Sequence, residues 1–362
     1  MASKNVVIAG GGTGGHIYPG LALAEKLKKE DASYEVHFVG ARGGMEETIV
    51  PRYGYQLHLF PVDRLHHSVG FFRRLKTLFL LPICFVQAVF LYFYLRPKWV
   101  LGVGGFASAP FVFVSAILGG RTAILEPNAF PGMANRYLAR FVEFCFLVFQ
   151  ETEKFFPKNK VRTVGLPVRF NSIAEGQPYT GDRKLRLLIF GGSQGARAVN
   201  QVVGDWVKNN PQMGEKIEIV HQVGQRDFHI WEKEYAENYN SFLTYQAYIH
   251  DMPEKLAWAD LVICRAGIGT VAEIAMSRTP AIFIPLPTAA DNHQQKNAET
   301  LVNRQASFMF LQKEFDHQTL QKKLEDILQN PQQLLTMKKQ LAEIDYSQAP
   351  AKILQQLNGA AN

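Results

Sequence analysis

Twice in this chain, a short apolar run leads into a cluster of glycines and then into an amphipathic stretch. The first copy is NVVIAGGGTGGHIYPGLALAEKL (5–27), and the second is LRLLIFGGSQGARAVNQVV (185–203). Each copy predicts a strand, a glycine turn and a helix, because the apolar residues after the turn follow the three-to-four spacing of a helix. Strands that alternate with helices favour parallel sheets, whose ligands bind at the carboxyl ends of the strands.

Further strand patterns follow each copy, so the unit recurs along the chain. We expect strands at 34–40, 97–105 and 121–128 after the first copy, and at 216–224, 259–267 and 280–287 after the second. A chain of 362 residues is long enough for two domains with a core each. The Pro- and Gly-rich stretch GLPVRFNSIAEGQPYTGDRK predicts a connection between them. We therefore expect an α/β protein with an N-terminal domain at 1–165 and a C-terminal domain at 166–345.

The tail from Asp316 to Leu357 has a helical pattern. We expect interruptions at Asn330–Pro331 and at Ala349–Pro350, because proline cannot continue a helix from the preceding turn. The last helix, at about 346–362, is expected to pack back on the N-terminal domain.

Composition narrows the classes of protein. Hydrophobic residues make up 47% and charged residues 20%, which excludes disorder over most of the length. The three cysteines lack the spacing of a disulfide framework or a zinc site. The net charge of +7 favours anionic partners. The start MASKNVVIAGGG lacks a signal-peptide pattern, so we expect a cytoplasmic location.

The stretch TLFLLPICFVQAVFLYFYL (77–95) carries no charge and is long enough to be tested as a membrane span. Pro82 and Gln87 interrupt it, and basic residues flank both of its ends. A helix that belongs partly to the core and partly to a membrane surface fits this pattern best. A plain buried helix and a true span remain the alternatives.

The first glycine turn matches the dinucleotide pattern GxGxxG through Gly10, Gly12 and Gly15. A nicotinamide or flavin site would also need an acid at the end of the second strand to hold the ribose. The sequence there is HFVGARGG, and Glu35 lies at the other end of that strand. A diphosphate cradle of another kind is therefore favoured over a dehydrogenase site, since backbone N–H groups at a helix start bind anions.

Two side chains stand out beside the glycine turns. His16 follows the first turn, and imidazole is the side chain that exchanges a proton near neutral pH. Its alternative role is a hydrogen bond to a backbone carbonyl. Glu273 in CRAGIGTVAEI (264–274) is placed to accept two hydrogen bonds from a ribose diol. Its alternative role is a first-turn acid that stabilises the helix dipole.

Taken together, the motifs make the chain resemble the MurG family of bacterial UDP-GlcNAc transferases. The motifs are GGGTGGHIYPGLALAEKL, GVGGFASAP, LEPNAFPGMANR, GLPVR, GGSQGARAVN, YIHDMPEKLAWADLVICRAG, GTVAEI and DNHQQKNA, in order over nearly the whole chain. The resemblance implies a GT-B fold, with two Rossmann-like domains and an active site in the cleft between them. It also implies that GlcNAc moves from UDP-GlcNAc to undecaprenyl-diphosphate-MurNAc-pentapeptide (lipid I), giving lipid II for peptidoglycan.

The resemblance also implies roles for single residues. His16 matches the histidine proposed as base, Asn128 the asparagine that contacts GlcNAc, and Glu273 the glutamate that binds the ribose. The backbone of Ile249 matches the group that pairs with uracil. The implied donor site comprises Thr13, Gly14, Gly15, Asn128, Arg169, Ser193, Ile249, Arg265, Ile268, Gly269, Thr270, Val271, Ala272, Glu273, Gln294 and Gln295, and the implied membrane patch Phe71, Phe72, Arg73, Arg74, Lys76, Leu78 and Phe79.

Three positions depart from the family pattern. Leu125 and Pro127 stand where the family commonly has His and Gln beside the sugar pocket, and Phe106 stands where it has Tyr. His16, Asn128 and Glu273 are unaffected.

The implied chemistry is an inverting transfer to the 4-hydroxyl of MurNAc, with His16 as base. No DxD-type pair of acids is apparent, so we expect neither a cofactor nor an essential protein-held metal, with a loosely bound Mg²⁺ on the diphosphate left open. The implied partners are UDP-GlcNAc, lipid I and the anionic cytoplasmic face of the bacterial inner membrane, without nucleic acid. The alternatives are a non-catalytic nucleotide-binding module, and another GT-B enzyme such as a glycolipid synthase or a UDP-sugar epimerase.

Overall fold

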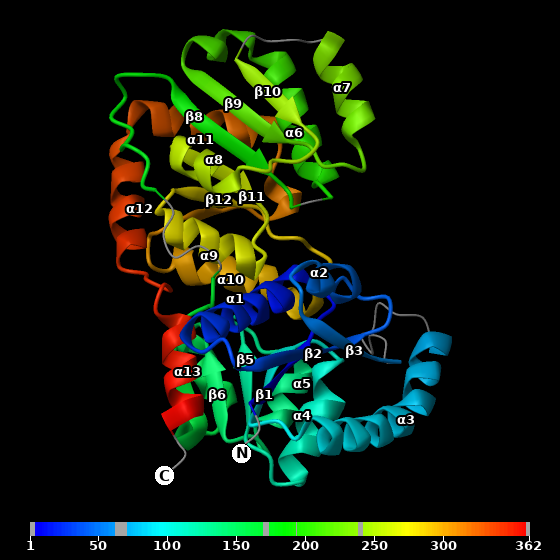
Figure 1. Ribbon diagram of the computed structural model, residues 1–362. Helices are drawn as coiled ribbons and strands as arrows, with labels where there is room; N and C mark the ends of the chain where they lie inside the picture. Colours follow the sequence, from blue (N-terminus) through cyan, green and yellow to red (C-terminus); the bar gives the residue numbers. More distant parts are fainter. Residues whose placement is uncertain (1–3, 62–70, 169–173, 193, 238–241, 360–362) are drawn as a thin grey trace. The chain divides into compact units, whose positions relative to one another are not determined.

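The computed structural model describes residues 4–61, 71–168, 174–192, 194–237 and 242–359, with side chains omitted at 71–78 and 236–237. The chain divides into two compact units. Unit 1 comprises Met1–Arg169 and Tyr346–Asn362, and unit 2 comprises Phe170–Asp345. Figure 1 shows their helices and strands, with labels where there is room.

Unit 1 is built on a parallel sheet that has seven strands among the described residues, in the order β3-β2-β1-β4-β5-β6-β7. The chain turns back at the centre of this order, between β1 and β4, which is where doubly wound sheets bind ligands. The strands are β1 (Asn5–Gly10), β2 (Glu35–Ala41), β3 (Gln56–Phe60), β4 (Trp99–Gly104), β5 (Thr122–Glu126), β6 (Phe144–Leu147) and β7 (Val161–Thr163).

Helices cover both faces of this sheet, so its central strands are buried over nearly their whole length. One core contains Ile17 and Leu21 of α1 with Ile353 of α13, and the other contains Phe111 of α4 with Cys84 of α3. The helices are α1 (Gly14–Glu30), α2 (Glu46–Arg52), α3 (Phe71–Leu95), α4 (Ser108–Ile117), α5 (Met133–Leu138) and α13 (Ala349–Gly359), with short 3-10 turns η1 (Gln150–Phe155) and η2 (Lys158–Lys160).

Helix α3 has one buried and one exposed apolar face. Cys84 and Ala88 are buried against the sheet, and the amide of Gln87 donates to the carbonyl of Leu59 on β3 at 3.2 Å. Phe79 and Phe90 lie on the other face, each 73% exposed. These exposed side chains rule out a plain buried helix. Among the described residues, no helix combines the length and apolar character needed to span a bilayer.

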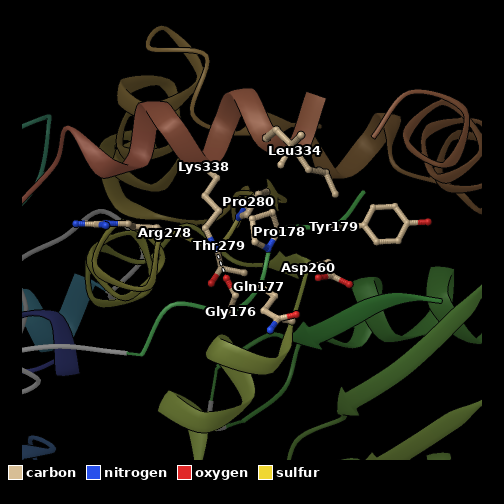
Figure 2. Close-up of a pocket in the computed structure, with 12 residues that line it drawn as sticks. Gly176, Gln177, Pro178, Tyr179, Asp260, Arg278, Thr279, Pro280, Leu334 and Lys338 are labelled. Carbon is tan, nitrogen blue, oxygen red and sulfur yellow. Dashed lines mark hydrogen bonds between the residues drawn. The ribbon is translucent and has the colours of Figure 1, made fainter. Parts of the chain in front are cut away.

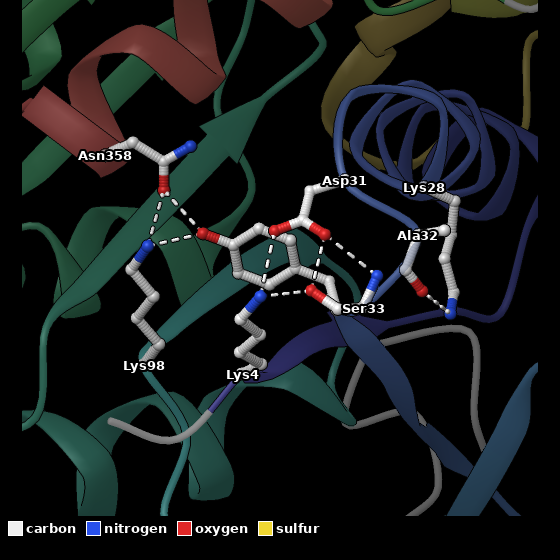
Figure 3. A network of polar contacts seen from close by, with 8 residues as sticks. Lys4, Lys28, Asp31, Ala32, Ser33, Lys98 and Asn358 are labelled. Atoms are coloured by element: carbon white, nitrogen blue, oxygen red, sulfur yellow. Dashed lines mark hydrogen bonds and ion pairs between the residues drawn. The ribbon is translucent and has the colours of Figure 1, made fainter. Parts of the chain in front are cut away.

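The last helix, α13, completes unit 1. Its side chains Ile353, Leu354 and Leu357 are buried in the same core as α1. At its end, Lys98 donates to Asn358 at 3.2 Å (Figure 3) and also to the hydroxyl of Tyr34. The chain therefore returns to its first unit after building the second.

Unit 2 repeats the architecture with a parallel sheet of six strands among the described residues, in the order β10-β9-β8-β11-β12-β13. The strands are β8 (Leu185–Phe190), β9 (Ile217–Gln222), β10 (Leu243–Gln246), β11 (Leu261–Cys264), β12 (Ala281–Phe283) and β13 (Phe308–Met309). The helices are α6 (Arg197–Asn209), α7 (Phe228–Glu237), α8 (Met252–Trp258), α9 (Ile268–Ser277), α10 (His293–Val302), α11 (His317–Gln329) and α12 (Gln332–Ala342), with short turns η3 (Pro211–Glu215), η4 (Ala290–Asn292) and η5 (Gln312–Glu314).

Two doubly wound parallel sheets confirm the expected α/β class. Every expected strand is present, and β3, β6, β7, β10 and β13 are additional. The interruption at Asn330–Pro331 is confirmed between α11 and α12. The second interruption is also present, but it lies at 343–348, just before the expected Ala349–Pro350, because α13 begins at Ala349. Pro350 lies in its first turn, where proline has no intrahelical hydrogen bond to lose.

Candidate functional site

Two glycine turns meet at the carboxyl ends of β1 and β4 in unit 1. The N–H of Gly11 donates to the carbonyl of Gly104 at 3.2 Å. A Cβ on Gly105 would lie 2.5 Å from the carbonyl oxygen of Gly11, so only glycine permits this approach of one backbone to the other. The two turns form the floor of the site at the switch point of the sheet.

His16 lies above this floor, in the first turn of α1. Its own N–H donates to the carbonyl of Thr13 at 3.1 Å, which fixes the start of the helix. A Cβ on Gly104 would lie 2.6 Å from Nδ1 of His16, so the imidazole packs directly on that glycine. The structure thus places His16 half-buried at the point where a ligand of a doubly wound sheet binds.

The backbone N–H groups of the glycine turn before His16 differ in whether they have a protein acceptor. The N–H of Gly12 donates to Oε2 of Glu46, a buried carboxylate at the start of α2. Within the described part of the chain, the N–H groups of Gly14 and Gly15 have no protein acceptor. These two amides at the start of α1 therefore remain for an anionic or polar ligand.

Asn128 is held by a second buried carboxylate, Glu126, at the end of β5. The Glu126 side chain accepts from the N–H groups of Asn128 and Gly132, both at 3.0 Å, and from Nδ2 of Asn135 at 3.0 Å. Burial raises the pKa of Glu126 to about 7, although these hydrogen bonds oppose the rise. Glu126 thereby fixes the loop that presents Asn128.

Two of the three departures from the family pattern lie close to this loop. Leu125 is completely buried in the core with α1 and α13, so its side chain points away from the loop. Pro127 lies between Glu126 and Asn128. Phe106 is half-buried just after the Gly104–Gly105 turn.

In unit 2, the glycine turn after β8 touches the end of β9. A Cβ on Gly195 would lie 2.1 Å from the carbonyl oxygen of Val223, so the two turns are again in backbone contact. Gln222, buried at the end of β9, links this turn to the next loop. Its Nε2 donates to the carbonyl of Gly192 at 2.9 Å, and its Oε1 accepts from the N–H of Ile249 at 2.8 Å. Pairing of uracil with Ile249 would therefore use its carbonyl oxygen or displace Gln222.

The start of α9 forms the next part of the same sheet edge. A Cβ added to Gly267 or Gly269 would meet no atom within 4 Å, so the beginning of this helix is open. Ile268, Val271 and Ala272 are buried. Thr270 is half-buried beside them.

Glu273 lies beyond the first turn of α9, which contains no acidic residue. The alternative role of Glu273 as a first-turn acid is therefore wrong. The thiol of Cys264 is buried, which raises its pKa well above the usual range, and the charge of Glu273 adds to this rise. Glu273 lies in α9, the helix that follows the carboxyl end of β11.

Arg265 and Gln294 brace the end of β12, whereas Gln295 bonds within its own helix, α10. The guanidinium of Arg265 donates to the carbonyl of Ile284 at 2.9 Å and to Oε1 of Gln312 at 2.7 Å, and burial lowers its pKa. Gln294 accepts from the N–H of Leu286 at 3.0 Å, and Gln295 donates to Glu299 at 2.9 Å. The contacts of Arg265 and Gln294 fix the loop between β12 and α10.

Some assigned residues lie outside this description. Arg169 and Ser193 are outside the described residues, and the side chains of Phe71, Phe72, Arg73, Arg74, Lys76 and Leu78 are not described. Phe79 is exposed. Within the described residues, no three His, Cys, Asp or Glu side chains are grouped to hold a metal ion.

Our sequence analysis missed Glu46, Glu126 and Gln222. Glu126 carried a readable signal, because it is an acid at the end of the buried apolar run TAILE, whereas Gln222 ends the mixed strand IEIVHQ and carried a weaker one.

A small hollow in unit 2 lies at the opposite edge of the sheet, just before β11 and β12, and it is lined by Asp260, Thr279 and Pro280 (Figure 2). Asp260 accepts from Arg183 at 2.7 Å, and Lys338 donates to the carbonyl of Gly176. The protein's own groups thus satisfy the polar atoms here. Since parallel sheets bind ligands at the carboxyl ends of their strands, this hollow is not the candidate site.

Comparison with known proteins gives a consistent result. Residues 6–146 match the model of the glycosyltransferase family 28 N-terminal domain, and residues 186–356 match that of the glycosyltransferase family 28 C-terminal domain. The UDP-N-acetylglucosamine–N-acetylmuramyl-(pentapeptide) pyrophosphoryl-undecaprenol N-acetylglucosamine transferase of Bdellovibrio bacteriovorus is 44% identical, over 88% of each chain. The enzyme of the same name from Myxococcus xanthus is 38% identical, over 92% of this chain and 87% of that one. The crystal structure of Acinetobacter baumannii MurG superposes with a TM-score of 0.78 at 28% identity, over 98% of this chain and 99% of that one.

Proposed function

The chain belongs to glycosyltransferase family 28, and on that premise we propose that it transfers N-acetylglucosamine from UDP-GlcNAc to lipid I. The product is lipid II, the disaccharide precursor of peptidoglycan. The names of the two curated relatives support this reaction, since they match this chain over most of their length. Unit 1 takes the acceptor and unit 2 takes the donor.

The observation that carries the proposal is the position of His16. Its imidazole packs on Gly104 at the switch point of the unit 1 sheet, next to the open amides of Gly14 and Gly15. A general base must reach the hydroxyl from which it takes a proton, and this position is where a ligand of such a sheet binds. A non-catalytic nucleotide-binding module would have no use for a histidine there.

The transfer proceeds by a single displacement. His16 takes the proton of the MurNAc 4-hydroxyl while its oxygen bonds to the anomeric carbon of GlcNAc. The bond from that carbon to the diphosphate breaks on the opposite side, UDP leaves, and the α-linked donor becomes a β-1,4 product. The glycine turn after β8 and the start of α9 direct N–H groups at the departing diphosphate, and Glu273 accepts from the ribose hydroxyls. Neither a cofactor nor a protein-held metal takes part.

The test is release of UDP from UDP-GlcNAc, with and without a lipid I analogue. We expect release to require the analogue, and the His16→Ala variant to be slower by roughly 10²- to 10⁴-fold. His229→Ala, at an exposed histidine of unit 2, is the control and should match the wild type. UDP release at the same rate with and without the analogue would indicate a different reaction on the same fold. An unchanged rate in the His16→Ala variant would show that His16 is not the base.

The acceptor is a membrane lipid, so we also propose that unit 1 docks on the anionic cytoplasmic face of the membrane. Exposed apolar side chains gather on three helices that pack in a row, α3, α4 and α5. They include Phe79, Ile83, Val86, Phe90, Phe93 and Tyr94 on α3, Ile117 on α4, and Met133 and Tyr137 on α5. Apolar groups on a helix whose sequence begins with basic residues at 73, 74 and 76 suit an anionic membrane surface.

Sedimentation with vesicles tests this docking. Vesicles rich in phosphatidylglycerol should carry the protein down, and neutral phosphatidylcholine vesicles should carry less of it. Phe90→Ser should weaken the binding, because it removes an apolar ring from the proposed docking surface. The fold should persist, because this ring is 73% exposed and so contributes little to the core. Ile230→Ser, at an exposed apolar residue of unit 2, should bind as the wild type does. Equal binding by both variants would contradict docking through α3.

A further inference from the structure

We propose that Glu46 is a positioning residue of the transfer reaction. Its carboxylate holds the first glycine turn by a hydrogen bond and so fixes the position of His16. This inference rests on the proposed function, because it takes His16 as the base. Glu46 touches neither substrate in the proposal and acts only through the turn.

The Glu46 carboxylate joins two loops of the site. It is the first residue of α2, and only 1% of its surface is exposed. Its Oε2 accepts from the N–H of Gly12 at 2.7 Å, and its Oε1 accepts from the N–H of Ala41, at the end of β2, at 2.8 Å. Both oxygens are therefore acceptors, and the turn after β1 is tied to the neighbouring strand.

The surrounding backbone is shaped to admit this side chain. A Cβ on Gly11 would lie 2.1 Å from Oε1 of Glu46, and one on Gly44 would lie 2.4 Å from Oε2. A Cβ on Gly40 would lie 2.5 Å from Cγ of Glu46. Three glycines from three segments thus leave room for one carboxylate, so several of the glycines serve Glu46 rather than a ligand.

The tie has a direct consequence for the site. Five of the six residues at 10–15 are glycines, so the turn has many accessible conformations in the absence of fixed contacts. The hydrogen bond from Gly12 selects one of them and directs that amide away from the ligand, while the amides of Gly14 and Gly15 stay open. His16 is the next residue after the turn, so a change in the turn would move its imidazole. A displacement of about 1 Å in a reacting group can lower the rate roughly 100-fold.

The test compares Glu46→Gln with Glu47→Gln. The first substitution keeps the shape of the side chain, but its amide directs an NH₂ group at one of the two N–H donors. Glu47 is the matched control, because it is exposed and accepts from the N–H of Gly43, at 2.8 Å. We expect kcat to fall 10- to 100-fold in Glu46→Gln, with an unchanged dissociation constant for UDP. Glu47→Gln should match the wild type.

A double variant separates positioning from general damage. If Glu46 acts through His16, then adding Glu46→Gln to the His16→Ala variant should lower its rate little further. A misplaced base and an absent base impair the same proton transfer, so the two effects should not add. A role in stability alone would lower the rate by the same factor in both backgrounds and would overturn the inference. Wild-type kcat in Glu46→Gln would also overturn it.

Two further results complete the test. If Glu46→Gln does not fold, Gly40→Ala displaces the same carboxylate without altering its charge, and a selective loss of kcat is again expected. Absence of transfer by the wild-type protein would instead refute the proposed function itself. The two failures are therefore distinguishable.

Discussion

Replacing Glu126 by Gln should change how the stability of unit 1 depends on pH. Burial raises the pKa of this carboxyl to about 7, from 4.5 in an unfolded chain. As pH rises through this interval, the unfolded chain releases the proton first, so the native state of the wild type loses stability. The loss approaches about 3 kcal/mol once pH exceeds the native pKa. Glu126→Gln does not titrate, so its stability relative to the wild type should rise by that amount.

The assay is urea unfolding at pH values from about 4.5 to about 8, with hydrogen exchange of β5 peptides reporting on unit 1. A constant offset between the proteins is expected, because the amide makes different hydrogen bonds with Asn128 and Asn135. The informative quantity is the change of that offset with pH. Glu151→Gln, at an exposed position of the same unit, should leave it flat. A flat offset in Glu126→Gln would refute the reasoning from burial.

Two other substitutions test the donor loops and the last helix. Gln222→Leu should raise the dissociation constant of UDP roughly tenfold in calorimetry, because the N–H of Ile249 and the carbonyl of Gly192 lose a buried partner; Gln225→Leu, at an exposed position nearby, is the control. An unchanged constant would mean that Gln222 does not shape the donor site. Ile353→Ala should cost about 2–5 kcal/mol of unfolding free energy in urea, since Ile353 is fully buried, whereas Gln355→Ala on the exposed face of α13 should cost little. A cost below about 1 kcal/mol would contradict a core role for α13.

The sequence predicted the central strands and both glycine turns because the physical signal is local there. VVIA (6–9) and LLIF (187–190) are continuous apolar runs, as is typical of buried parallel strands, and His16 directly follows the first turn. Four of the five additional strands, β3, β7, β10 and β13, were missed for the opposite reason, whereas the apolar β6 (FCFL) carried a local signal that was overlooked. QLHLF and LTYQ form the edge strands β3 and β10 and mix polar with apolar residues, and β7 and β13 are only three and two residues long. Such strands are determined by pairing with distant neighbours rather than by their own composition.

Glu46 shows why part of the site could not be predicted. It lies 34 residues from Gly12, and acids at a helix start are common for reasons unrelated to ligands. The role of Glu46 can be recognised only in the folded chain, where the end of β2 lies beside the turn after β1. Glu126 differs, because an acid that ends the apolar run TAILE already signals a buried carboxylate. A polar residue at the end of a buried strand is therefore a useful marker of such sites.

The return of α13 to unit 1 has a consequence for synthesis on the ribosome. Domains usually fold in the order in which they are made. Here unit 1 lacks Ile353, Leu354 and Leu357 until residues 349–359 emerge, so the partner face of α1 stays uncovered while all of unit 2 is translated. Unit 2, although it is translated after most of unit 1, is the first of the two to have its complete core. A nascent chain that stalls before α13 would therefore carry a finished unit 2 and an unfinished unit 1, and the unfinished unit would be exposed to chaperones and proteases.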